Sequence, residues 1–407
     1  MMNRILRDVY LTAAISGVLL SSTTANADDF KPFFDISGLA DVKISFGDTE
    51  LSTFDGGFGK TREGDGTNVR LSQAALIGFG QLTPSLSAVA HIQYNPDLQD
   101  EVDIFEAFLR YRPVSTGRVR YTTKLGAFIP HVSAENKGRG WTNLFTLTNS
   151  AANTWIAEEV RPLGLDFTAE YRGDTFDAEV GASVFINNDN SGAGLALRGF
   201  VLNDQNVGIF GEVRIPDVGM RIGQTQAPFR EGDDSPGFAV SARLSSEDYG
   251  EFIAYYSDNG ATAGEPFSNG GQAWDTRFLT ASYNHDLPGG VFVNLQGLVG
   301  TTETIANGGP LGTNFSTISL LLAKEIGDLQ LATRGELFDQ NDTSDCPCPF
   351  LGETGEALTV AATYRLGDHH RFIGEYLHVS SDREGATANQ PASFNENVFQ
   401  LAYRLVF

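Results

Sequence analysis

Five basic side chains in the stretch 102–127 are spaced so that they could act together on a charged ligand or ion. They are Arg110, Arg112, Arg118, Arg120 and Lys124, all at even positions, and Glu106 shares that spacing. Apolar residues hold the odd positions, among them Phe105, Ala107, Leu109 and Tyr111 before a turn at 113–117. Because successive side chains of a strand point to opposite faces, the cations belong to one face of two adjoining strands.

Two interpretations of this row of cations are open. In the first, it is a basic stripe that attracts anions. In the second, the cations pair with carboxylates on neighbouring strands and only stiffen the wall that carries them. The acidic residues that could serve as partners are Asp166, Glu170, Glu179 and Glu212.

The sequence carries no complete catalytic motif. Gly59-Lys60-Thr61 matches the end of a phosphate-binding loop, but Phe54 occupies the position of its first glycine. Neither a Gly-x-Ser-x-Gly elbow nor a His-Glu-x-x-His zinc motif occurs, and the six histidines are scattered. We therefore expect no enzyme activity, no catalytic residues, no cofactor and no metal site.

Two further polar features have structural interpretations. Cys346 and Cys348 favour a small-ring disulfide over a metal site, because no histidine or third cysteine lies close in sequence. Acidic residues concentrate around 47–69, 231–234 and 340–356. We expect them to be solvated surface charge in exposed loops; divalent cations or lipid phosphates are the alternative partners.

The N-terminus predicts a secreted protein. Arg4 and Arg7 precede an apolar run from Val9 to Leu20, and Ala25-Asn26-Ala27 completes a signal peptide over residues 1–27. Residues 28–407 then form one domain. They contain no apolar run of about 18 residues, which excludes inner-membrane helices. A net charge of −23 argues against nucleic-acid binding.

Strand-like runs and two kinds of connection fill the rest of the chain. Tight turns are expected at 83–84, 173–174, 288–289, 327–328 and 367–368, and longer polar loops at 47–69, 131–163, 258–274, 302–313, 340–355 and 381–394. One rim of short turns and one rim of long loops is typical of an all-β, transmembrane, antiparallel up-and-down barrel. Eighteen strands are expected, with sixteen as the alternative, because the segments within 194–245 are weak.

This architecture places the row of cations inside the barrel. A charge on the lipid-facing side would cost about 2–4 kcal/mol at mid-depth, so the even positions of 102–127 should face the lumen. The short turn should keep Arg112 and Arg118 near one mouth of the barrel, with Lys124 farther in.

The last eleven residues have the strongest period-two pattern. Phe399, Leu401, Tyr403, Leu405 and Phe407 alternate with residues that include Gln400 and Arg404. We expect this strand to close the cylinder by pairing with the first strand, at 33–46, with Phe399, Tyr403 and Phe407 on the closing strand. A buried edge strand of a soluble β protein is the alternative.

This terminal strand resembles those of Gram-negative outer-membrane β-barrel proteins, the porins in particular, which end in Phe. The resemblance implies a bacterial outer-membrane location, contact with lipid and lipopolysaccharide, recognition by the insertion machinery and a homotrimeric assembly. It also implies a passive diffusion channel for small hydrophilic solutes. A weaker similarity, to phosphate-selective porins of the O/P type, rests on 124–130 and 221–229, but the two copies differ in spacing by one residue and the basic clusters are sparser.

The longest connection, 131–163, is similar in length and position to the porin loop that folds inward and sets the constriction. The residues expected to do so are Trp141, Phe145, Trp155, Glu158 and Glu159. An outward surface cap is the alternative. Loop acids act weakly on an ion deep in the lumen, because the Debye length is about 8 Å at physiological salt. The inner cations therefore predict weak anion preference or near-neutral selectivity. Rival functions are an occluded structural or adhesive barrel and an outer-membrane enzyme.

Overall fold

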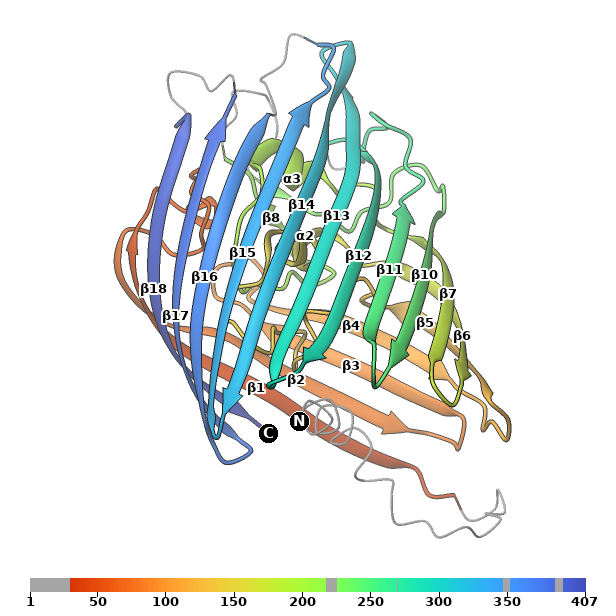
Figure 1. Cartoon of the computed structure of the whole chain (residues 1–407). Coiled ribbons are helices and arrows are strands. Elements are labelled where there is room, and N and C mark those ends of the chain that lie inside the picture. Colours follow the sequence, from red (N-terminus) through yellow and green to blue (C-terminus); the bar gives the residue numbers. More distant parts are fainter. Residues whose placement is uncertain (1–29, 217–224, 269, 347–351, 385–390) are drawn as a thin grey trace.

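The computed structural model describes residues 30–216, 225–268, 270–346, 352–384 and 391–407. The expected signal peptide, 1–27, and Cys348 lie outside the described residues. The described chain forms a closed antiparallel barrel of sixteen strands (Figure 1). No helix in the described part of the chain is long and apolar enough to cross a membrane.

Each barrel strand pairs with the next one along the chain, and β18 pairs with β1. The strands are β1 (Phe33–Asp48), β2 (Gly66–Gln81), β3 (Leu86–Tyr94), β4 (Val102–Tyr111), β5 (Val119–Ala127), β6 (Leu163–Arg172), β7 (Asp177–Ile186), β10 (Gly237–Ser246), β11 (Gly250–Asp258), β12 (Asp275–Leu287), β13 (Val291–Ala306), β14 (Gly309–Ile326), β15 (Leu329–Asp342), β16 (Glu353–Leu366), β17 (His370–Arg383) and β18 (Ser393–Val406).

Sixteen strands is the second of the two numbers expected from the sequence, and eighteen is two too many. The difference lies within 194–245. There the chain forms a helix, α3 (Ala193–Arg198), and a two-residue ladder between β8 (Val213–Arg214) and β9 (Thr225–Gln226). The stretch from 193 to 209 is almost wholly buried, so it needs no alternation between a lipid face and a lumen face.

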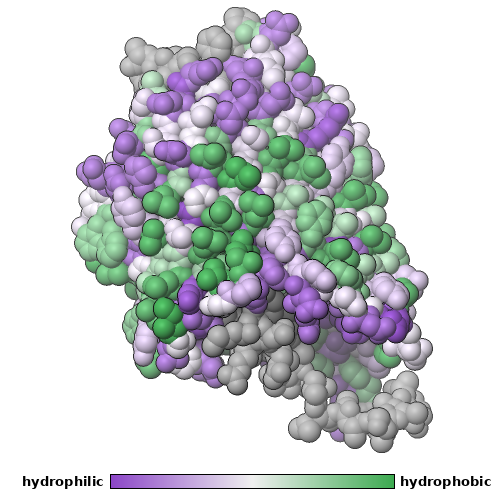
Figure 2. All heavy atoms as spheres, in the orientation of Figure 1, coloured by the Kyte–Doolittle hydropathy of each residue, from purple (hydrophilic) through white to green (hydrophobic). Residues whose placement is uncertain are grey.

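The alternation expected of a membrane-facing wall is present. On β13, β14 and β15 the exposed positions include Leu295, Ile318 and Leu337, whereas Gln296, Ser319 and Glu336 beside them are buried inside. Figure 2 shows hydrophobic side chains gathered across the middle of the wall and hydrophilic ones toward the upper rim. An apolar exterior around a polar interior is the arrangement that lipid requires of a barrel.

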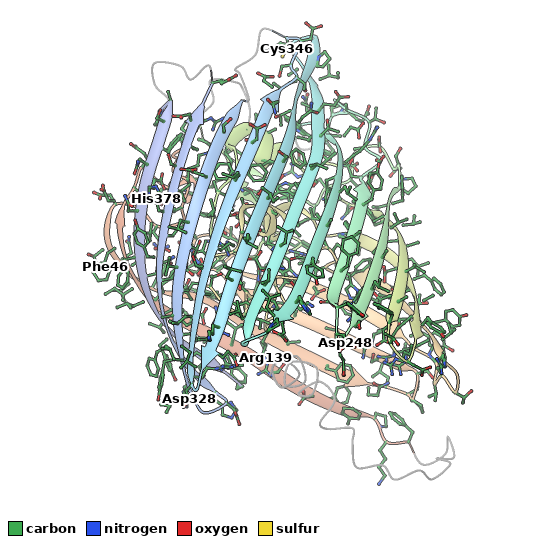
Figure 3. All side chains as sticks on the ribbon, viewed as in Figure 1. Phe46, Arg139, Asp248, Asp328, Cys346 and His378 are labelled. Atoms are coloured by element: carbon green, nitrogen blue, oxygen red, sulfur yellow. The ribbon has the colours of Figure 1, made fainter. Side chains whose placement is uncertain are left out.

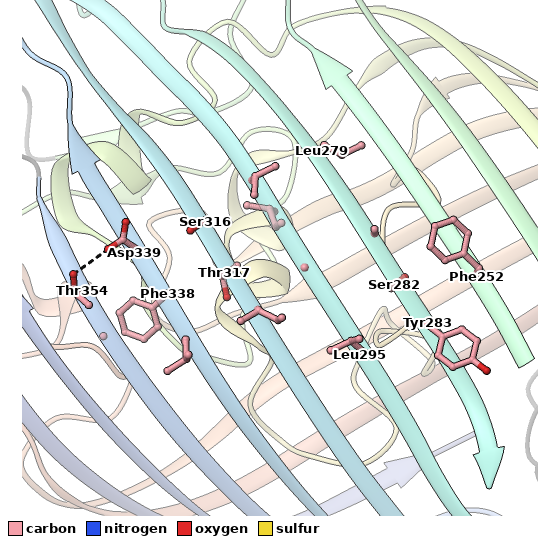
Figure 4. A pocket seen from close by; sticks show the side chains of 17 residues that line it. Phe252, Leu279, Ser282, Tyr283, Leu295, Ser316, Thr317, Phe338, Asp339 and Thr354 are labelled. Atoms are coloured by element: carbon pink, nitrogen blue, oxygen red, sulfur yellow. Dashed lines mark hydrogen bonds between the residues drawn. The ribbon is translucent and has the colours of Figure 1, made fainter.

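One shallow hollow marks this outer wall between β11 and β16 (Figure 4). Its volume is about 760 Å³, and the small residues Ala281 and Gly297 lie between larger neighbours that include Leu279 and Leu295. The hollow has the same apolar character as the surface around it.

The barrel closes through its terminal strand, as expected. The register runs from Leu39 opposite Val406 to Asp48 opposite Asn397. Phe399 stacks on Phe46 of β1, with ring centroids 6.3 Å apart, on the outer edge of the barrel (Figure 3). The Tyr403 hydroxyl lies 2.7 Å from His370 Nδ1 on β17. The closing strand is thus fixed on both sides.

A bulge in β4 reverses one expected orientation. The pairing with β3 shifts between His91 and Ile92, which leaves Phe105 as the extra residue. Phe105 was expected on the lipid face, but it is fully buried inside the barrel, its ring 4.8 Å from that of His91. A bulge inserts one residue and shifts the alternation by one, so spacing alone could not locate this change of face.

The two rims differ as expected, with two corrections. Figure 3 places Asp248 and Asp328 on the rim of short turns and Cys346, which has no free thiol, at the opposite rim. The expected loop 302–313 is instead a tight turn at Asn307 and Gly308, both with positive φ, which extends the β13–β14 hairpin above the wall. The expectation of an exposed loop at 47–69 is also wrong, because residues 60–63 are buried.

Candidate functional site in the barrel lumen

Three connections of the long-loop rim fold into the barrel: 49–65, 128–162 and the described parts of 187–236, which are 187–216 and 225–236. Figure 1 shows α2 and α3, which belong to the second and third of them, enclosed by the wall. The helix α2 (Ala151–Glu159) begins at Ser150, whose hydroxyl accepts a hydrogen bond from the Asn153 N–H, and all nine of its residues are buried. The inward fold expected of 131–163 is therefore confirmed.

Trp155 anchors α2 to the wall. Its ring meets Phe278 of β12 and Phe315 of β14 edge to face, at centroid distances of 4.8 and 5.1 Å. Phe200, from the third inward connection, packs on Phe315 and on Phe338 of β15. Aromatic pairs in this geometry contribute about 0.5–1.5 kcal/mol each beyond the burial of their surface.

These aromatics belong to an apolar cluster in the middle of the lumen. Its other members include Val132, Ile156, Val160, Leu195 and Leu202 from the inward connections, and Leu298, Leu377, Val379 and Val398 from the wall. A barrel interior that only holds water is polar. The apolar cluster therefore packs the inward connections against the wall from β7 to β18 as a protein core.

Charged residues of the wall also hold the connection 128–162. The guanidinium of Arg334 on β15 donates to Glu135 Oε1 at 2.8 Å and to the Asn149 carbonyl at 2.9 Å. The Glu375 carboxylate of β17 accepts from the N–H of Leu147 at 2.6 Å and of Thr148 at 3.1 Å. The backbone of 147–149 is thus fixed by charge-assisted hydrogen bonds, which are about twice as strong as neutral ones.

Glu158 and Glu159, expected at a constriction, are fully buried in helix packing. Glu158 forms an ion pair with Arg198 at the end of α3. Glu159 accepts hydrogen bonds from the N–H groups of Gly192 and Leu195, at 2.7 and 2.8 Å, which cap the start of α3. Burial, opposed by Arg198, raises the pKa of Glu159 to about 7. The two carboxylates therefore join α2 to α3.

The other two residues expected in the constriction lie apart from each other. Phe145 stacks on Phe292 of β13, with ring centroids 4.7 Å apart. Trp141 has a positive φ of 57°, and its ring centroid lies 6.2 Å from that of Phe105, the extra residue of the bulge. Next to it, the Arg139 guanidinium donates to the backbone oxygen of Phe407. The connection thus crosses the lumen as far as the closing strand.

A second charged network, which the sequence did not reveal, fixes 49–65 inside the barrel. Lys43 of β1 lies between Glu63, at 2.7 Å, and Asp204, at 3.0 Å. Arg62 contacts Asp204 at 2.7 Å and Asp97 at 2.5 Å. Burial would raise the pKa of Asp204, but Arg62 and Lys43 hold it far below its usual value. The partners come from four separate segments, so no local spacing could show them.

Three of the five cations expected at the lumen do face it. The Arg110 guanidinium donates to Ser87 Oγ at 3.1 Å and lies 5.5 Å from the ring of Phe79. Arg120 is 3.9 Å from Glu170. Lys124 Nζ lies 5.5 Å from the ring centroids of Phe108 and Phe128. All three are half-buried.

The other two cations lie on the short-turn rim, the mouth near which the sequence predicts them. Arg118 is exposed and pairs with Asp174 of the neighbouring turn at 2.9 Å. Arg112 follows the end of β4, where its N–H donates to the Ser85 carbonyl at 2.7 Å. Glu106 is inside, where its carboxylate accepts from the Ile129 N–H at 2.7 Å and so orients the start of the inward connection.

Carboxylates alternate with these cations on the facing strands. Asp166 is the register partner of Lys124, and Glu179 lies 3.0 Å from His131 Nδ1. Glu212, another expected partner, lies instead beside Arg230 in 187–236, at 3.8 Å. The inner face of β4 to β7 therefore carries charges of both signs. Both interpretations of the cation row hold in part, because some cations have a carboxylate beside them and Arg110 has none among the described residues.

No protein-family model matches the chain, and no curated protein matches it in sequence. Solved structures do match its fold. A loop L8 deletion mutant of OmpT, an outer membrane protein of Vibrio cholerae, matches with a TM-score of 0.54 at 11% identity, covering 92% of this chain and 99% of its own. The anion-selective porin from Comamonas acidovorans gives 0.52 at 12% identity, over 93% and 100% of the two chains.

A third match is the outer membrane channel DcaP of Acinetobacter baumannii, with a TM-score of 0.52 at 9% identity, covering 95% of this chain and 100% of that one. At these identities the likeness establishes the fold and not the solute. The chain has the porin-like fold of outer-membrane β-barrels.

Proposed function

We propose that this protein is an outer-membrane porin-type channel, a route for the passive diffusion of small hydrophilic solutes, with no catalytic residue. One observation carries the proposal: an apolar-walled closed barrel holds a charged interior, and a long connection folds into it beside cations and carboxylates that remain partly open to solvent. Only a closed barrel satisfies all backbone groups of a membrane-spanning sheet. The bacterial outer membrane, with its lipid and lipopolysaccharide, is the proposed location.

The structural neighbours support this proposal. One is named an anion-selective porin and another an outer membrane channel. Their folds cover more than nine-tenths of this chain. The shared fold favours a channel but assigns no solute.

The charges below the inward connections lead us to propose weak anion preference. Arg120 has Glu170 beside it, and Lys124 faces Asp166, so these positions largely compensate one another. Arg110 forms no ion pair with a carboxylate among the described residues. A cation that faces the lumen acts on a passing ion at short range, whereas loop acids farther away than the Debye length are screened, so one uncompensated cation outweighs them.

An occluded barrel is the second candidate, and one observation favours it. The apolar cluster around Trp155 and Phe315 packs inside the barrel against the wall from β7 to β18. A barrel closed in this way would serve a structural or adhesive role. The two candidates differ in a single measurable property, which is ion conductance.

Conductance in planar bilayers tests the proposal. The mature chain, purified from outer membranes, should give discrete steps in KCl and a small reversal potential of anion-preferring sign in a salt gradient. A mock preparation from cells without the gene controls for contaminating porins. A folded, heat-modifiable barrel that adds no steps above this control would overturn the channel and favour the occluded barrel.

We also propose a homotrimer, inserted by the outer-membrane assembly machinery through its closing strand. One OmpT structure is a trimer form, with a TM-score of 0.50 at 11% identity, covering 93% of this chain and 100% of its own. Light scattering of the detergent-extracted protein tests the stoichiometry. A monomer at all concentrations would contradict the trimer without affecting the channel.

A further inference from the structure

Three carboxylates meet where 187–236 leaves and rejoins the wall, apart from the lumen lining described above. Asp189 follows β7, and Glu231 and Asp233 precede β10, which pairs with β7. One carboxylate oxygen from each residue lies within 4.8 Å of the other two. Three negative groups this close repel one another unless a positive charge or a proton lies between them.

Two oxygens of this cluster have no partner among the described residues. Asp189 is 1% exposed; its Oδ2 accepts from the Gly232 N–H at 2.7 Å, but its Oδ1 has no hydrogen bond. Glu231 accepts from the Asn187 N–H at 2.9 Å through Oε2, and its buried Oε1 also lacks a partner. Buried polar atoms are nearly always satisfied, so these two oxygens point to a bound group.

The third carboxylate is held in place from outside the cluster. Asp233 accepts from the N–H of Ser235 at 2.9 Å and of Thr262 at 2.7 Å. The Asp189 backbone is fixed as well, since its N–H donates to the Arg230 carbonyl and its carbonyl accepts from the Trp274 N–H. The oxygens are therefore preorganised by described residues of two connections, among them Gly232, Thr262 and Trp274.

We propose that Asp189, Glu231 and Asp233 form a calcium-binding site at the neck of the inward connection 187–236. Carboxylate oxygens are the preferred ligands of hard divalent cations. Ca²⁺ accepts irregular oxygen geometry, whereas Mg²⁺ demands a near-ideal octahedron and sheds its water reluctantly. Because Asp189 is fully buried and Asp233 is fixed by backbone N–H groups, the site suits Ca²⁺ better than Mg²⁺.

The cation joins the two ends of the connection that carries α3 into the barrel. Between Asp189 and Glu231 the chain carries α3, whose start is capped by Glu159, and Asn190, whose side-chain amide donates to Gln226 and to the Ala227 carbonyl. A ligand that binds only the folded neck stabilises the whole connection by mass action. Bound Ca²⁺ therefore makes the inward position of α3 more stable.

Calcium binding to the full mature chain, purified in detergent and stripped with EDTA, tests the site without reference to channel activity. Calorimetric titration with CaCl₂ should show one saturable site, and MgCl₂ should bind more weakly. Tb³⁺, a luminescent substitute for Ca²⁺, should show emission sensitised by the adjacent Trp274 and lose most of it in Trp274→Phe. Competition by CaCl₂ should remove the emission.

Variants then assign the ligands. Asp189→Asn and Glu231→Gln should each weaken calcium binding about tenfold or more, since affinity follows the ligand charge count. Asp234→Asn is the matched control: it makes the same change one residue from Asp233, at an exposed position whose positive φ of 59° asparagine tolerates. Circular dichroism and heat-modifiable migration confirm that each variant is folded. Absence of saturable binding, equal binding of Mg²⁺, or unchanged affinity in both folded ligand variants would overturn the proposal; a proton shared by Asp189 and Glu231 would then explain the cluster.

Discussion

Arg334 on the wall and Glu135 in the inward connection form a fully buried ion pair, with Nη1 and Oε1 2.8 Å apart although the residues are 199 positions apart in the chain. The same guanidinium contacts Glu336 at 3.0 Å. One side chain of β15 thus helps to hold 128–162 inside the barrel.

Arg334→Met should release this connection. Removing one partner of a buried pair typically destabilises by about 3–5 kcal/mol, because the remaining carboxylates are left uncompensated. We expect easier unfolding in urea and a larger, noisier conductance. Arg365→Met is the matched control, since its pair with Glu325, at 2.7 Å, is partly exposed and should contribute about 1 kcal/mol or less. Equal effects of the two variants would contradict this role of Arg334.

Replacing 136–158 with a short Gly-Ser linker should widen the channel, because this segment carries α2 and crosses the lumen. Single-channel conductance should increase, and Trp155→Ala should give a smaller increase, since it removes only the contacts with Phe278 and Phe315. If a folded barrel that lacks the segment conducts as the wild type does, the segment does not limit the route.

Phe407→Asp should reduce assembly more than it changes conductance. Gly38 and Phe407 exchange two backbone hydrogen bonds, of 2.8 and 3.0 Å, at the seam of the barrel, and the Phe407 ring is partly exposed. A charge there disturbs the seam and its apolar surroundings, whereas Phe407→Leu, the control, retains apolar contact. The folded fraction in outer membranes is the measurement. Normal amounts of Phe407→Asp with an altered pore would contradict the prediction.

Arg110→Ala combined with Arg120→Ala should shift the reversal potential toward cation preference, since both guanidinium groups face the lumen. Arg118→Ala is the control: its partner Asp174 lies on the exposed rim, so its loss should leave the reversal potential unchanged. If the wild type is strongly cation-selective and the double substitution leaves its reversal potential unchanged, these arginines have only a structural role in the wall.

Glu159 should make stability depend on pH. Its pKa is raised from 4.5 to about 7 in the folded protein, and burial is the largest cause. The charge of Arg198 lowers this pKa, and the charge of Glu158 raises it. Between these values the folded state holds a proton that the unfolded state has lost, so stability falls as pH rises from about 4.5 to 7, by up to about 3 kcal/mol. Urea unfolding of the wild type and of Glu159→Gln across this range should differ in slope. Parallel slopes would exclude the titration of Glu159.

Comparing wild type with Glu159→Gln isolates this effect. Asp189, whose pKa burial also raises to about 7, contributes equally to both proteins. Lys60, whose pKa burial lowers to about 8, changes stability only above that window.

The position of the site was predicted better than its contacts. Spacing placed Arg110, Arg120 and Lys124 on the inner face because strand geometry repeats every two residues. It placed Phe105 on the wrong face, because a bulge changes the alternation without any mark in composition. Trp155 and Glu159 were correctly assigned to an inward connection, but their partners Phe315 and Leu195 come from elements that no local pattern relates to them.

The sequence by itself determined the barrel, its two unequal rims and its closing strand. These follow from local rules, since lipid selects apolar residues at every second position and tight turns have characteristic residues. Only the tertiary structure decided that there are sixteen strands, that Lys43 and Arg62 enclose Asp204, and that Asp189 meets Glu231. The lumen is filled by segments far apart in the chain, and their buried charges must find partners wherever the closed wall brings them together.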